Sequence, residues 1–128
     1  MTEALLSFHR VWGWVAIGAN AAAGLLLLVV WRVRPLQKQR WIWWPTIGAE
    51  AAMLLQVLIG TIIVASNTAY AKVNGVRFHM FYGFVAFITV GLAYQYRGYM
   101  KSRRAMIYGL VGLFLMGVGI RAWMQVAM

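Results

Sequence analysis

Residues 11–31 read VWGWVAIGANAAAGLLLLVVW, an uncharged apolar run bounded by Arg10 and Arg32. A helix needs about 20 mostly apolar residues to cross the hydrocarbon core of a bilayer, and this run is long enough to do so. Three further apolar runs lie at about 45–65, 78–96 and 105–126, with Glu50 as the charged residue of the first and Arg121 of the last. Because short segments connect them, we expect an all-α integral membrane protein, an antiparallel bundle of four helices that forms a single domain over residues 1–128.

The composition supports the same class. Of the 128 residues, 63% are hydrophobic and 11% are charged, and a soluble domain of this length could not bury so much apolar surface. The absence of cysteine excludes disulfides and thiolate metal sites. The chain has only two acidic residues, which argues against a catalytic site that needs paired carboxylates. The net charge of +10 is carried by cations between the apolar runs, so we expect the lipid bilayer, and not nucleic acid, as the partner.

The distribution of basic residues predicts the orientation. Eight of the twelve lie in the segments 32–40 and 97–104, which we expect on the cytoplasmic side of the plasma membrane. The other four lie toward the opposite side: Arg10, Lys72, Arg77 and Arg121. Both termini then face outward. We expect the first helix to be retained and not cleaved as a signal peptide, since its strongly basic segment follows the apolar run.

One octapeptide pattern occurs twice, at residues 9–16 and 79–86. Both copies read His, two variable residues, aromatic, Gly, aromatic, Val, Ala, and they contain the only two histidines in the chain. The helices that carry them run in the same direction across the membrane. The histidines are therefore expected at similar depth near the outer face, within a parallel pseudo-repeat of two helical hairpins.

The two copies predict a cofactor site. On a helix, Gly13 shares a face with His9, and Gly83 shares a face with His79; an alanine continues each face. Such bare backbone suits a flat macrocycle between the two helices, and histidine is an axial ligand of haem iron. We therefore predict that His9 and His79 ligate the iron of one haem b, with Nε2 atoms about 4 Å apart. The alternative is ordinary packing of small residues in membrane helices.

Several polar residues accompany this site. We expect Arg10 and Arg77, which flank the histidines, to pair with the haem propionates, the alternative being lipid headgroups. Gln56 is expected to donate a hydrogen bond to another helix or to contact the edge of the cofactor. Glu50 is expected to pair with a basic residue such as Arg104 or Arg103, the alternatives being a proton path or a quinone site.

Three short motifs also occur in a particular order: His9-Arg10, then residues 54–60 (LLQVLIG), then Phe78-His79 followed by Gly83. Their types and order resemble the heme A synthase family, which has a His-Arg helix, a Leu-Gln-x-x-x-Gly helix and a further His-bearing helix. The resemblance covers about residues 3–96. It implies paired histidines that ligate a haem near the outer face of the membrane.

The chain departs from that family in several ways. It is long enough for one four-helix half of the family enzyme, and it lacks the helix that precedes the His-Arg helix. It also has Leu6 where the family has an acidic residue three positions before the histidine. The resemblance therefore favours haem binding over haem modification. Four-helix cytochromes of b type share the same arrangement.

The sequence thus predicts a small membrane b-type cytochrome for electron transfer, with quinone or a larger respiratory complex as its redox partner. One alternative is enzymatic, a half-size relative of heme A synthase that works as a homodimer. The other is a non-haem accessory subunit of a respiratory or transport complex, docked through small-residue stripes such as Gly109-Gly112 and Gly117-Gly119. The sequence leaves open whether the chain is an enzyme.

Overall fold

The computed structural model describes residues 2–127, and this part of the chain contains helices and no strand, which confirms the all-α class. Four helices are long and apolar enough to cross a membrane, as expected of a multi-pass membrane protein. They are α1 (Thr2–Arg32), α2 (Trp43–Ser66), α3 (Val76–Gln95) and α5 (Arg104–Ala127).

Short helical segments connect the long helices. They are η1 (Arg34–Lys38), η2 (Arg40–Ile42), η3 (Thr68–Lys72), α4 (Arg97–Met100) and η4 (Lys101–Arg103). Proline suits the first turn of η1, because the N–H that it lacks has no partner there. Asn67 caps η3 by accepting a hydrogen bond from the Ala69 N–H at 3.1 Å. Gly75 precedes α3 with a φ of 84°, a left-handed conformation that glycine adopts without strain.

The first helix is longer than its apolar run. It begins at Thr2 and not near residue 11, because Ala4, Leu5 and Leu6 are good helix formers and Glu3 lies in the first turn, where a negative charge is favourable. His9 therefore lies inside a helix, with two turns of α1 before it. The bounds of the other three long helices lie within two residues of the expected ones.

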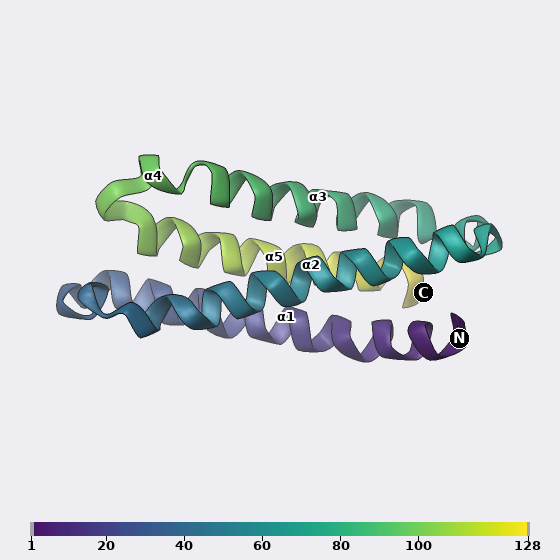
Figure 1. Ribbon diagram of the computed structural model, residues 1–128, viewed down its shortest axis with the longest axis horizontal. Coiled ribbons are helices and arrows are strands. Elements are labelled where there is room, and N and C mark those ends of the chain that lie inside the picture. Colours follow the sequence, from purple (N-terminus) through teal and green to yellow (C-terminus); the bar gives the residue numbers. More distant parts are fainter. Residues whose placement is uncertain (1, 128) are drawn as a thin grey trace.

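The four long helices lie lengthwise beside one another, and the connections alternate between the two ends (Figure 1). Both chain ends lie at the same end of the molecule (Figure 1). The helix α1 packs most extensively against α5 and α2, and α3 packs mainly against α5. The contact between α2 and α3 is smaller. The start of α1 and the start of α3 are thereby placed at one end of the bundle, on opposite sides of its axis.

Glycines bring the backbones of α1 and α5 into contact. A Cβ atom on Gly24 would lie 2.8 Å from the carbonyl oxygen of Gly109, and one on Gly112 would lie 2.8 Å from that of Asn20. Such close approach through small residues is typical of membrane helix pairs. Gly109 and Gly112 therefore pack inside the molecule and are not free for docking a partner.

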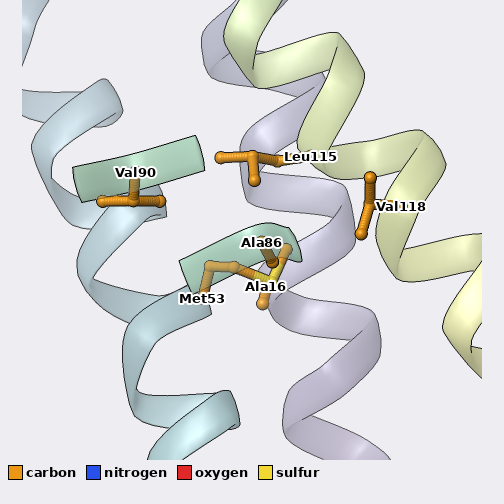
Figure 2. Packing of buried hydrophobic residues seen from close by; sticks show 6 residues of the cluster. All are labelled: Ala16, Met53, Ala86, Val90, Leu115 and Val118. Carbon is orange, nitrogen blue, oxygen red and sulfur yellow. The ribbon is translucent and has the colours of Figure 1, made fainter. Parts of the chain in front are cut away.

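A cluster of small and branched side chains fills the middle of the bundle. Its buried members come from all four long helices: Ala16, Met53, Ala86, Val90, Leu115 and Val118. Ala16 and Ala86 lie together beside Met53 (Figure 2). Asn20, the next residue on this face of α1, is 1% exposed and donates from Nδ2 to the carbonyl oxygens of Ala16 and Ala49. The centre of the bundle is thus closed about two turns from the histidines.

Candidate functional site

The two histidines of the chain lie side by side. His9 projects from α1 and His79 from α3, and their ring centroids are 5.9 Å apart with the ring planes at 75°. Both side chains are half-buried. Residues seventy positions apart in the sequence therefore meet at the end of the bundle that also holds both chain ends (Figure 1).

One hydrogen bond determines which ring nitrogen of His79 carries the proton. Its Nδ1 lies 2.8 Å from the carbonyl oxygen of Ala122 in α5. A carbonyl oxygen only accepts, so Nδ1 carries the proton and donates it. The lone pair of the neutral ring is then on Nε2. A histidine that gives one N–H to a backbone carbonyl and keeps the other nitrogen free has the usual arrangement of a metal ligand.

The separation of the rings suits a shared metal. Two imidazoles on one metal ion, each about 2 Å from it through nitrogen, have centroids roughly 6 Å apart. The observed separation is 5.9 Å. Within residues 2–127 no group of three or more His, Cys, Asp or Glu side chains is placed to hold a metal. Two histidines are a poor set for a bare ion but the full axial set for haem iron, whose macrocycle supplies the other donors. The donor set therefore fits haem.

The helix α2 shapes the surroundings of His9. A Cβ atom on Gly60 would lie 3.0 Å from Cε1 of the His9 ring, so glycine makes room for the imidazole at this point. Gln56, one turn earlier, donates from Nε2 to the backbone oxygen of His9 at 2.7 Å. A Cβ atom on Gly13 would lie 2.8 Å from that Nε2. The interhelical hydrogen bond expected of Gln56 is present, and Gly13 gives the amide its space.

Two polar atoms beside this contact have no protein partner. His9 Nδ1 and Gln56 Oε1 are buried, and neither makes a hydrogen bond within the described residues. His79 has a proton fixed on Nδ1 by Ala122, whereas His9 has no such acceptor. No protein acceptor therefore fixes which ring nitrogen of His9 carries the proton.

The sequence predicts that small residues leave the helix backbone open beside each histidine, and this is only partly so. Gly13 is covered by the Gln56 amide, and the alanines of the two octapeptides are buried together in the central cluster. A Cβ atom on Gly83 would meet nothing within 4 Å. The symmetry of the octapeptides is broken because α2 packs closely on α1, while α3 makes a smaller contact with α2. Of the two glycines, only Gly83 thus leaves open space beside its helix.

The flanking cations are free to bind anions. Arg10, next to His9, and Arg77, near the start of α3, are exposed. Neither side chain makes a hydrogen bond or an ion pair among the residues that the structure describes. Both are thus placed at the surface beside the histidine pair, as a propionate or headgroup contact requires.

The expected ion pair of Glu50 with Arg104 or Arg103 is not formed among the residues that the structure describes. The guanidinium of Arg104 instead donates from Nε and Nη2 to the carbonyl oxygen of Arg97, at 3.3 and 3.2 Å. These bonds join the first residue of α5 to the first residue of α4, so a backbone oxygen takes the place of the carboxylate as acceptor. Glu50 is half-buried on α2, far along the bundle from the histidines.

Sequence reasoning missed two contributors to the site. Ala122 acts through its backbone oxygen, for which no residue type is diagnostic. Gly60 belongs to the stretch LLQVLIG, and its role follows only from its contact with the His9 ring. Ligation of a metal between two histidines is the chemistry that this arrangement supports. No protein-family model, no curated protein and no solved structure matches this chain.

Proposed function

We propose that the chain is a small b-type membrane cytochrome, in which His9 and His79 are the axial ligands of one haem b. The observation that carries the proposal is the histidine pair, with centroids 5.9 Å apart and the Nδ1 proton of His79 held by Ala122. When bound, haem supplies a one-electron couple. Its redox partner is quinone or a larger respiratory complex.

The proposal includes a membrane arrangement. The chain is an antiparallel four-helix bundle in the plasma membrane, a parallel pseudo-repeat of two hairpins, with both termini outside. The basic segments 32–40 and 97–104 then face the cytoplasm, as expected from the excess of Lys and Arg in cytoplasmic loops. The histidines lie near the outer face, so electron exchange occurs there.

The surrounding residues position the two histidine rings and provide cations beside them. Ala122 holds the His79 ring with Nε2 directed away from α5. Gln56 hydrogen-bonds the backbone oxygen of His9 and so links α1 to α2. Gly60 has no side chain, which leaves room for the His9 ring to pack against α2. The exposed Arg10 and Arg77 pair with the propionates, as charge-assisted hydrogen bonds favour.

The test is a spectrum of the purified protein after expression with added haem. We expect a low-spin b-type spectrum at one haem per chain, and its loss in His9→Ala and in His79→Ala. Met80→Ala is the control, because Met80 follows His79 on α3 and is 45% exposed. A colourless wild-type protein, or unchanged spectra in both histidine variants, would falsify the proposal. Mass spectrometry of the extracted haem separates a cytochrome, which returns haem b, from an enzyme that modifies it.

A further inference from the structure

A groove runs along the outside of the bundle between α3 and α5. It has a volume of 370 Å³ and is lined by Tyr82, Phe114, Gly117, Val118 and Arg121. The four lining residues of α5 are spaced three and four apart, so they follow one face of that helix. The groove therefore extends about 10 Å along α5, from Arg121 near the chain end toward the middle of the helix.

The end of the groove at Arg121 carries two converging donors. Arg121 is exposed, and its Nε donates to the hydroxyl of Tyr82 at 3.3 Å. The Tyr82 hydroxyl accepts this bond and keeps its own proton to donate. The terminal guanidinium nitrogens of Arg121 have no partner among the described residues. An anion placed here would receive hydrogen bonds from both side chains.

Charge decides what kind of molecule fits this end. Arg121 lies within a helix that is apolar enough to cross a membrane, where an arginine requires a polar or anionic partner. Both acidic residues of the chain are on other helices, Glu3 on α1 and Glu50 on α2, and neither forms an ion pair within the described part of the chain. Guanidinium binds phosphate through paired hydrogen bonds. A zwitterionic head group also offers a phosphate, but its cation cancels the net charge, so a head group with a net negative charge complements Arg121 better.

The rest of the groove is apolar and hollow. Phe114 is half exposed and Val118 forms part of the buried wall. A Cβ atom on Gly117 would meet nothing within 4 Å, so the missing side chain leaves the groove open. Free phosphate would use only the Arg121 end. A molecule with an anionic head and a hydrocarbon tail uses both parts.

We propose that this groove binds one anionic phospholipid, with its phosphate on Arg121 and Tyr82 and an acyl chain along Phe114, Gly117 and Val118. The proposal is independent of the haem assignment, since none of these residues is a ligand of the histidine site. It differs from general lipid contact in its stoichiometry of one and in its preference for a negative head group.

Native mass spectrometry of the detergent-purified full chain tests the head group. Samples receive phosphatidylglycerol, phosphatidylcholine or inorganic phosphate alone. We expect one retained phosphatidylglycerol per chain and less phosphatidylcholine, because the choline cation of the latter offsets the phosphate charge and weakens its attraction to Arg121. Arg121→Gln is expected to lower retention about tenfold. Lys72→Gln is the control, because Lys72 is exposed and outside the groove.

A second pair of variants tests the tail. Gly117→Leu keeps the charge and fills the groove, and we expect it to lower phosphatidylglycerol retention severalfold. Gly18→Leu is the matched control, because a Cβ atom on Gly18 in α1 also meets nothing within 4 Å. Equal losses in Arg121→Gln and Lys72→Gln, or in the two glycine variants, overturn the proposal. So does equal retention of phosphatidylcholine, or a phosphate adduct in place of a lipid.

Discussion

The histidine pair depends on residues that carry no reactive group. Gly60 leaves room for the His9 ring, and Ala122 supplies an oxygen to His79. Gln56 holds the backbone of His9 and not its side chain. The two histidine rings are therefore positioned by α2 and α5, two helices that contain no histidine.

Replacing Gly60 should disturb the site directly. In Gly60→Ala the new Cβ would lie 3.0 Å from Cε1 of His9, so the ring must move. We expect reduced haem content and a shift from low-spin toward high-spin bands, with a stability cost of about 1–3 kcal/mol from overpacking. Gly48→Ala is the control on the same helix, because its Cβ would meet nothing within 4 Å. A low-spin spectrum of full intensity in Gly60→Ala would contradict this role.

Replacing Gln56 should weaken the attachment of α1 to α2. Gln56→Leu removes the 2.7 Å hydrogen bond to the His9 oxygen. We expect the free energy of unfolding to fall by about 1 kcal/mol, as interhelical hydrogen bonds in membranes contribute. Thr61→Val is a suitable comparison, because the Thr61 hydroxyl bonds only within α2, to Val57. Thermal unfolding in detergent measures the midpoints of both variants. Equal midpoints would show that the Gln56 hydrogen bond does not attach α1 to α2.

The sequence predicted the two histidines and the interhelical hydrogen bond of Gln56, but not the contacts of Gly60 and Ala122 with the imidazole rings. His9 and His79 were identifiable because they are the only histidines and share a pattern with a helical spacing. Ala122 was not, since a backbone oxygen is common to every residue type. The pairing of Glu50 with Arg104 was wrong because a nearby backbone oxygen, at Arg97, was the better-placed acceptor. Local spacing is readable from sequence, whereas competition between acceptors requires the folded chain.

At the scale of elements, the α1–α5 contact is the most extensive in the bundle. The apolar runs were enough to predict four helices and their approximate bounds. They did not predict which contact between helices is the most extensive, because this depends on where the backbones approach closely. Gly24 and Gly112 mark that approach.

A side chain at this contact should separate the two helices. In Gly24→Ala the Cβ would lie 2.8 Å from the backbone oxygen of Gly109, which has no flexible end that can yield. We expect a loss of about 3 kcal/mol or more of stability, at the upper end for overpacking. Gly91→Ala in α3 is the control, since its Cβ would meet nothing within 4 Å. Thermal midpoints in detergent compare the two, and similar values would argue against the close approach.

At the scale of the whole molecule, the exterior is apolar along the bundle and basic at its ends. Large exposed hydrophobic residues occur on all four long helices, including Leu25, Ile47, Phe84 and Phe114. Such a surface is stable in lipid and would aggregate in water. The basic segments 32–40 and 97–104 lie at one end and the histidines at the other (Figure 1).

The orientation can be tested without a background signal, because the chain has no cysteine. Asn74→Cys places a thiol in the turn before α3, and Ser102→Cys places one in the segment before α5. In intact cells an impermeant maleimide should label Asn74→Cys and not Ser102→Cys, and permeabilisation should expose both. The reverse labelling would place the histidine end in the cytoplasm.

The contact between α1 and α5 also bears on the order of events during synthesis. The helix α1 emerges from the ribosome before the other three, yet its most extensive partner is α5, which emerges after them. Until α5 inserts, the glycine face of α1 has no partner and His79 has no acceptor for its Nδ1 proton. The histidine pair is therefore completed only when translation of α5 has finished, and the nascent chain cannot assemble its site one helix at a time.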